Sequence, residues 1–257
     1  MNRTMISLAV AGLAMTATGA GAQSVAALIE GNSIAIVDVK AAKAGTPVKV
    51  AGAGKLVGID VRPADGLLYG LFDDGTLVTI DPKTGATAAK SKLEVMLPSG
   101  TTATVDFNPV ADRLRVIGSD GTNLRANVDD GKVTKDGALR FAEGDANKAV
   151  TPRIVAGAYT NSVKGAKETA LYDIDAATGT LVKQAPPNDG VLNAVGSLGV
   201  SAASYAFDIP AGGANEGWLM ADGTLYRVDL ASGKATAAGK IGGISGMVHD
   251  IAILPAP

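Results

Sequence analysis

The chain has 257 residues, of which 47% are hydrophobic and 19% charged, and this composition excludes a disordered protein. Its formal net charge of -2 excludes a strongly basic nucleic-acid-binding protein, because neutralising phosphates requires a cationic face. The absence of cysteine excludes disulfides and thiolate metal sites, and the single histidine, His249, excludes a site with several histidine ligands.

The first 22 residues have the pattern of a secretory signal peptide. Arg3 is the only charge, an apolar stretch runs from Met5 to about Ala17, and Ala20-Gly21-Ala22 fits the small-x-small cleavage pattern. The apolar stretch is too short to span a membrane. We therefore predict a signal peptide at 1–22, a mature chain that begins near Gln23, and export to the periplasm or the outside of the cell. A buried N-terminal helix is the alternative.

One pattern recurs five times in the rest of the chain. It consists of an apolar strand, a turn with Gly, and then Thr, Ser or Asn before a Leu or Ile that opens a second strand. The Asp-Gly and Gly-Asn pairs in these turns are strong hairpin signals, since a primed two-residue turn needs positive φ. The copies lie 43 to 57 residues apart, and their second strands open at Ile34, Leu77, Leu124, Leu181 and Leu225.

Each unit contains three further predicted strands. One precedes each hairpin, at 25–29, 67–72, 113–118, 170–175 and 217–221. Another follows it, at 47–52, 86–93, 132–139, 191–199 and 235–242. The last type is predicted to be innermost, at 57–63, 103–109, 153–160, 204–210 and 247–254.

Four antiparallel strands in a unit of about 45 residues are typical of a β-propeller blade. We therefore predict an all-β fold, a five-bladed β-propeller that forms a single domain over 23–257. The chain starts with strands two to four of a blade, so the extra strand at 247–254 is expected to complete that blade and close the ring. A double sandwich is the alternative fold, and short helical pieces are considered only within 135–150.

Four stretches carry a resemblance to a known family: LVGIDVRPADGLLYGL at 56–71, VDFNPVADRLRVIGSDGTNLR at 105–125, VAGAYTNS at 155–162 and the segment 171–200. In order and content they resemble the bacterial family known as domain of unknown function 4394. The resemblance covers most of the predicted mature chain. It implies an exported protein with propeller-like repeats, and it implies no activity, substrate or catalytic residue.

Aspartates recur at matching points of four predicted innermost strands, at Asp60, Asp106, Asp208 and Asp250, while VAGAYT of the fourth unit carries no acid. Innermost strands line the channel of a propeller, so these carboxylates are candidates to converge near its axis and bind a ligand. They could hold Ca²⁺, which takes six to eight oxygen ligands. The alternative is structural: each carboxylate accepts hydrogen bonds from backbone N–H groups of an adjacent blade or turn, and this role is favoured because the residue repeats.

Three arginines are confined to the third unit. Arg113 and Arg115 are two residues apart and share one face of their strand, and Arg125 lies on the hairpin partner. Other units have Leu, Gly or Val near these places, so the repeat does not require arginine. Because the guanidinium fork matches carboxylates and phosphates, the group is a candidate anion site. The alternative is a network of salt bridges with Asp106, Asp112 and Asp129.

Two weaker candidates remain. The loop at 141–150 places Glu143, Asp145 and Asn147 at alternate positions, as in part of a calcium loop, but it lacks the terminal bidentate Glu. An exposed polar connection is favoured there. His249, beside Asp250, could serve as a general base, although its apolar neighbours favour a structural histidine.

The functional hypothesis is an exported, soluble β-propeller that acts as a binding or scaffold module. Its partner would be a small anionic ligand or a protein, with no nucleic acid and no membrane span, and a non-enzyme is favoured because common catalytic motifs are missing. Two alternatives stay open. One is a metal-dependent hydrolase or lyase that uses the channel carboxylates, and the other is a structural envelope or matrix protein.

Overall fold

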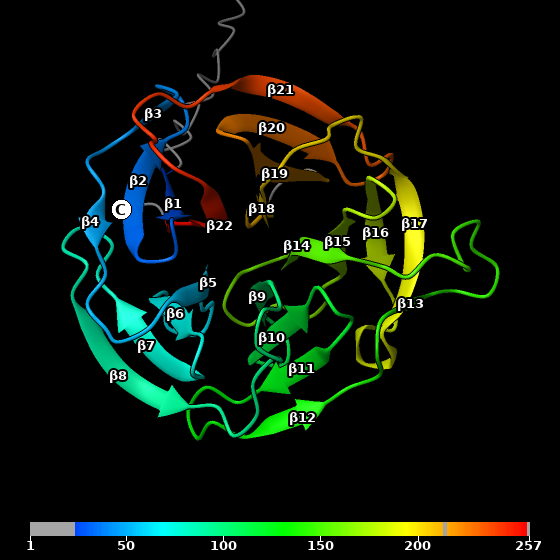
Figure 1. Ribbon diagram of the computed structural model, residues 1–257, viewed down its shortest axis with the longest axis horizontal. Coiled ribbons are helices and arrows are strands. Elements are labelled where there is room, and N and C mark those ends of the chain that lie inside the picture. Colours follow the sequence, from blue (N-terminus) through cyan, green and yellow to red (C-terminus); the bar gives the residue numbers. More distant parts are fainter. Residues whose placement is uncertain (1–23, 213–214, 256–257) are drawn as a thin grey trace, which may run out of the picture.

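The computed structural model describes residues 24–212 and 215–255, so the predicted signal peptide lies outside the described residues. Five small sheets stand in a ring, and the innermost strand of each lies at the ring's centre (Figure 1). This arrangement is a five-bladed β-propeller, which confirms the predicted fold. Among the described residues, no helix is long and apolar enough to cross a membrane.

Each sheet is one blade, and its strands follow one another from the axis outward. Blade 1 contains β22 (Val248–Ile253), β1 (Ser24–Ile29), β2 (Ser33–Asp38), β3 (Lys43–Ala44) and β4 (Val48–Lys49). Blade 2 contains β5 (Leu56–Val61), β6 (Leu68–Phe72), β7 (Thr76–Ile80) and β8 (Thr87–Lys92). Blade 3 contains β9 (Ala103–Asn108), β10 (Arg113–Gly118), β11 (Asn123–Ala126) and β12 (Val133–Lys135).

The last two blades follow the same order. Blade 4 contains β14 (Ile154–Tyr159), β15 (Leu171–Asp175), β16 (Thr180–Gln184), β17 (Val191–Ser197) and an added outer strand, β13 (Arg140–Phe141). Blade 5 contains β18 (Tyr205–Asp208), β19 (Glu216–Ala221), β20 (Thr224–Asp229) and β21 (Ala235–Lys240). The helical pieces considered within 135–150 are not found, because that stretch of the described chain forms β13 and turns.

The C-terminal strand closes the ring, as predicted. β22 pairs antiparallel with β1 over most of its length, with Val25 opposite Ile253 and Leu28 opposite Asp250. The first blade is therefore completed by residues from the far end of the chain. Closure by backbone hydrogen bonds leaves no open strand edge at the junction of the two ends.

The repeated Asp-Gly-Thr turns place their glycine at positive φ as predicted, but Asp74 and Asp120 are not at positive φ, so these two are not primed two-residue turns. Gly75 has a φ of 87° and Gly121 a φ of 89°, a region that side chains with a Cβ rarely adopt. The Asp74 carboxylate accepts a hydrogen bond from the backbone N–H of Thr76 at 2.9 Å, and Asp120 makes the same contact in the next blade. The aspartate orders the turn, and the glycine lets the chain reverse.

Small aliphatic side chains fill most of the space between blades. Between blades 1 and 5, for example, Val25 and Ile251 pack against Ala206 and Met220. An aromatic contact is found between blades 2 and 3, where Tyr69 and Phe107 meet edge to face with ring centroids 5.2 Å apart. The low aromatic content is thus compatible with a propeller, since short apolar side chains allow the sheets to pack closely.

Candidate functional site at the centre of the ring

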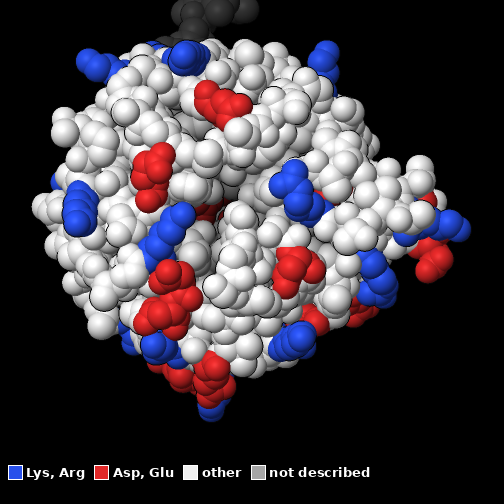
Figure 2. All heavy atoms as spheres, in the orientation of Figure 1, with Lys and Arg blue, Asp and Glu red and all other residues white. Residues whose placement is uncertain are grey.

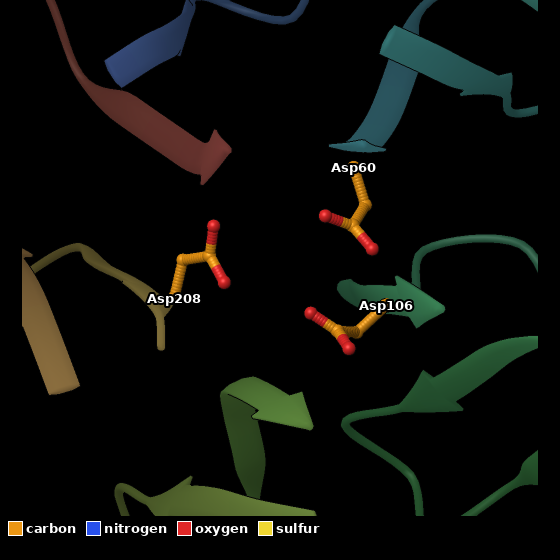
Figure 3. A group of neighbouring side chains, drawn as sticks. All are labelled: Asp60, Asp106 and Asp208. Atoms are coloured by element: carbon orange, nitrogen blue, oxygen red, sulfur yellow. The ribbon is translucent and has the colours of Figure 1, made fainter. Parts of the chain in front are cut away.

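Four buried aspartates project from innermost strands toward the axis. They are Asp60 on β5, Asp106 on β9, Asp208 on β18 and Asp250 on β22, and we name them the axial cluster. In Figure 3 the side chains of Asp60, Asp106 and Asp208 point toward one another from three strands. One carboxylate oxygen from each of these three lies within 4.8 Å of the others. The predicted convergence is therefore present for three of the four carboxylates, and Asp250 is not part of that group.

Each member of the axial cluster accepts a hydrogen bond from the backbone of the next blade. These cross-blade bonds are donated by the N–H groups of Phe107 to Asp60 (2.7 Å), Tyr159 to Asp106 (2.9 Å), Ile253 to Asp208 (2.6 Å) and Ile59 to Asp250 (2.9 Å). The structural interpretation of the repeated aspartates is confirmed by these bonds. The carboxylates can accept further hydrogen bonds besides these, because each oxygen has two lone pairs.

Asp106 differs from the other three in its second oxygen. In Asp60, Asp208 and Asp250, the oxygen that does not cross to the next blade accepts a bond from the following residue's own N–H, at 2.6 to 2.9 Å. No described residue donates a hydrogen bond to Oδ2 of Asp106, although its side chain is only 4% exposed. This oxygen is therefore an acceptor at the centre of the ring that the described protein leaves unused.

Burial and mutual repulsion raise the pKa values of the cluster. Burial is the main cause for Asp60 and Asp106, and repulsion from the Asp208 carboxylate adds to both. Burial raises the pKa of Asp208 to about 7, and that of Asp250 also lies well above its usual range. No lysine or arginine of the described chain forms an ion pair with any of the four. These shifts favour the protonated form of the cluster's carboxyl groups.

A cavity of about 560 Å³ opens over the cluster, at the end of the ring where the innermost strands finish. Asp60 and Asp208 line it, together with polar or charged side chains from Ser162 and Lys164 on the loop after β14. The rest of its wall is mainly apolar and includes Val61, Pro63, Val163, Ile209, Ile253 and Leu254. On the face shown in Figure 2, the middle of the ring is hollowed and acidic atoms are visible inside it.

The arginines of blade 3 lie away from this cavity. Arg115 is 2% exposed, and its guanidinium donates to Tyr159, Asn123, Asp136 and Asn188 at 2.6 to 3.2 Å. Arg125 donates two hydrogen bonds to the same Asp136. Arg113 donates hydrogen bonds only to backbone carbonyls, and it shares no partner with Arg115 or Arg125. The structure thus brings Arg115 and Arg125 together around an acid, and the anion site stays a prediction.

The salt-bridge partners suggested for these arginines are wrong. Asp112 and Asp129 pair instead with Arg62 of blade 2, at 2.6 and 3.0 Å. Hydrogen bonds from Arg62 hold the pKa of Asp129 at about 2. Asp106 bonds to backbone, as described above. Sequence reasoning overlooked Arg62 and Asp136. Their contacts join residues on different strands, loops or blades, and residue spacing does not reveal such contacts.

Blade 4 departs from the repeat at the axis. Asp60 lies opposite Tyr69, and the matching pair in blade 4 is Ala158 opposite Tyr172, so alanine stands where the other blades have aspartate. Blade 4 instead carries a buried acid, Asp173, on its second strand, opposite Gly157. Its carboxylate occupies the space beside Gly157, where a Cβ would collide with it.

Asp173 is fully buried, and neither of its oxygens has a hydrogen-bond partner among the described residues. Burial raises its pKa to about 8. Sequence reasoning missed this residue. A signal for it was available, since the matching positions of the other four blades are Ile29, Gly70, Val116 and Leu219.

The two weaker candidates lie apart from the axis cavity. In the 141–150 loop, Glu143 is exposed, while the Asp145 carboxylate accepts bonds from the N–H groups of Asn147 and Ala194 and ties the loop to blade 4. This is the favoured polar connection. His249 is partly buried, and burial lowers its pKa.

Residues 33–252 match the model of a protein family described as "Domain of unknown function (DUF4394)". The chain belongs to this family. The match spans all five blades and confirms the resemblance carried by the sequence motifs. The family's description gives no activity, so function has to be argued from the site.

Solved structures resemble the chain at low identity, and no curated protein matches it. A protein of unknown function from Bacteroides thetaiotaomicron VPI-5482 is 15% identical with a TM-score of 0.55, over 93% of this chain and 68% of that one. Another, from Bacteroides caccae, is 15% identical with a TM-score of 0.45, over 90% of this chain and 98% of that one. The first of these likenesses supports the fold alone.

Proposed function

We propose that the mature protein is an exported binding module that takes a small ligand into the axial cavity. The observation that carries this proposal is a largely apolar cavity of about 560 Å³ with buried carboxyl groups of raised pKa at its floor. Ligand sites are typically concave and mainly apolar, with a few convergent polar groups, and perturbed pKa values concentrate at such sites. Export is supported by the signal-peptide pattern of residues 1–22.

The fold does not require an aspartate at every axial position. Blade 4 packs against blade 5 with Ala158 at the matching position, so a blade can be built without an aspartate there. Four carboxyl groups in a buried space without a paired cation cost free energy. A ligand that uses them would account for their retention better than a purely structural envelope or matrix role would.

The test is to fill the cavity mouth and ask whether small molecules still bind. Ala211 is exposed and lines the cavity, so Ala211→Trp should narrow it with little effect on folding. Ala231, in the β20–β21 turn, is also exposed, and Ala231→Trp is the matched control. Ligand-observed NMR with a library of small amines, carboxylates and neutral aromatics should give hits for residues 23–257 that Ala211→Trp loses and Ala231→Trp keeps. Hits that survive Ala211→Trp, or no hits, would contradict the proposal.

A further inference from the structure

The chemistry at the floor of the cavity specifies the ligand more closely. Resting on the proposed function, we infer that the ligand is a small organic amine whose primary ammonium group binds between Asp60, Asp106 and Asp208 while its apolar body lies against the cavity wall. Two features carry this inference, the arrangement of acceptors around the axis and the character of the wall above them.

The acceptors match the donors of an ammonium group in number. An –NH₃⁺ group has three N–H donors and no acceptor. Three carboxylates converge from three strands, with one oxygen of each within 4.8 Å of the others (Figure 3). Oδ2 of Asp106 receives no hydrogen bond from the described residues, and its side chain is directed into this space although 96% of it is buried. An ammonium group at the centre would satisfy this oxygen.

The charge of the site also calls for a cation. The axial cluster contains four acids, and the described chain places no lysine or arginine in an ion pair with them. The basic residue that lines the cavity, Lys164, is exposed on a loop at the mouth. In the free protein, protons reduce the repulsion between the carboxyl groups. A bound ammonium group would replace such protons and be retained by charge-assisted hydrogen bonds.

The wall distinguishes an organic cation from a metal ion. Ca²⁺ takes six to eight oxygen ligands. One oxygen from each of Asp60, Asp106 and Asp208 converges, which is half of that number or less. Above them the cavity presents the side chains of Val61, Ile209 and Ile253, which offer no oxygen. These side chains are instead suited to the apolar body of an amine, because burial of apolar surface favours binding.

The probes are three molecules with one aromatic ring and different head groups: 2-phenylethylamine, 2-phenylethanol and 3-phenylpropionate. Isothermal titration calorimetry of residues 23–257 at pH 8 should show the amine binding about 10- to 150-fold more tightly than the alcohol, the range for hydrogen bonds to charged groups. Amine binding should release protons, seen as a dependence of the heat on buffer ionisation. Its affinity should rise from pH 5.5 to 8, because the amine stays charged while the carboxyls ionise.

Asp106→Asn is the informative variant. An asparagine can keep an oxygen acceptor for the Tyr159 N–H while removing the charge at the centre. The variant should lose at least about tenfold in amine affinity and leave binding of the alcohol unchanged. Asp173→Asn, which removes a buried carboxyl that does not belong to the converging group, is the matched control and should bind the amine normally. If Asp106→Asn does not fold, proton release by the unmodified protein still tests the inference.

The outcomes separate this inference from the proposed function. If the alcohol and the amine bind equally, or the carboxylate binds more tightly, the inference of an ammonium ligand is wrong, but the cavity is still a binding site. A metal site would replace the proposed ammonium site if Ca²⁺ binds in the absence of amine, displaces the amine and no longer binds to Asp106→Asn. The ammonium inference would also be wrong if the three probes do not bind while other molecules bind and lose their binding in Ala211→Trp. An absence of any hit sensitive to Ala211→Trp would contradict the proposed function itself.

Discussion

The two faces of blade 4 are joined to their neighbours by different chemistry. Toward blade 3, Arg115 reaches across to Tyr159 and Asn188, and the Asp106 carboxylate accepts the Tyr159 N–H. Asp173 belongs to this face, since its cross-strand neighbour Val182 packs with Ile117 of blade 3. Toward blade 5 the corresponding contact is apolar and includes Ala156, Ala158, Ile174, Phe207 and Leu219.

This difference shows that blade packing and axial chemistry are separable. The blade 4–5 interface forms without an axial acid, so apolar contact between sheets is sufficient there. At the blade 3–4 interface, directional hydrogen bonds are added to apolar packing, and they bring a buried guanidinium and a buried carboxyl into the structure. Acids that are dispensable for one interface can be retained at the others for binding, which is the basis of the proposed site.

The largest effect is expected from removing the strand that completes the ring. A chain ending at Gly246 lacks β22, with the buried side chains of Val248, Ile251 and Ala252 and the cross-blade bond of Asp250. Burial of a large aliphatic side chain contributes about 1.5–3 kcal/mol, so a loss of about 5 kcal/mol or more is expected, comparable with the total stability of many domains.

Thermal unfolding followed by circular dichroism, with size-exclusion chromatography, should show lost cooperativity or aggregation in that truncated protein. A chain ending at Pro255 retains the whole strand and is the control. Because this truncation acts on the ring as a whole, both faces of blade 4 should be affected together. If the chain ending at Gly246 unfolds like the control, closure by β22 does not stabilise the propeller.

Arg115→Ala should be the most damaging single change at the polar face of blade 4. It would leave Asp136, a carboxylate only 5% exposed, with Arg125 as its remaining ionic partner. Removing one member of a buried pair costs about 3–5 kcal/mol, and the second arginine places the expected loss at the lower end. Urea unfolding at pH 7 measures it.

Arg113→Ala is the matched control on the same strand. Arg113 donates only to the backbone carbonyls of Ala111 and Asp112, so a change within about 0.5 kcal/mol is expected. The same two variants test the predicted anion site. Equal and small losses of stability, together with a loss of anion-dependent stabilisation in Arg115→Ala, would show that Arg115 serves a ligand rather than the interface.

The sequence was sufficient for the fold because the repeat is local. The Asp-Gly-Thr turns fix hairpins, alternation of apolar residues identifies strands, and the unmatched strand at the C-terminus predicts closure. The convergence of Asp60, Asp106 and Asp208 follows from their matching positions once the ring is assumed.

The sequence was not sufficient for contacts between blades. Which acid pairs with which arginine depends on loop paths and side-chain reach, so Asp136 and Arg62 were overlooked. The cavity was also not predicted, since its walls come from loops after β5, β14, β18 and β22 whose lengths and sequences differ. Asp173 could have been found by aligning the second strands, where it stands alone among glycine and apolar residues.

The most specific effect concerns the pH dependence contributed by Asp173. Its pKa in the folded protein is about 8, against a usual value of 3.8. Between about pH 4 and pH 8 the unfolded chain loses a proton that the folded protein keeps. The free energy of unfolding should therefore fall as pH rises, by up to about 1.4 kcal/mol per pH unit from this group, and level off above about pH 8.

Asp173→Asn removes that contribution, so its stability relative to the unmodified protein should improve steadily from pH 5 to pH 7.5 in urea unfolding. The axial acids also favour the folded state at low pH, but they are present in both proteins and largely cancel in the difference. A constant difference between the two proteins across this range would mean that the carboxyl of Asp173 does not titrate between the two states. In that case the polar face of blade 4 would contain a solvated or partnered acid at Asp173, and the contrast with the apolar face would rest on Arg115 and Asp106 alone.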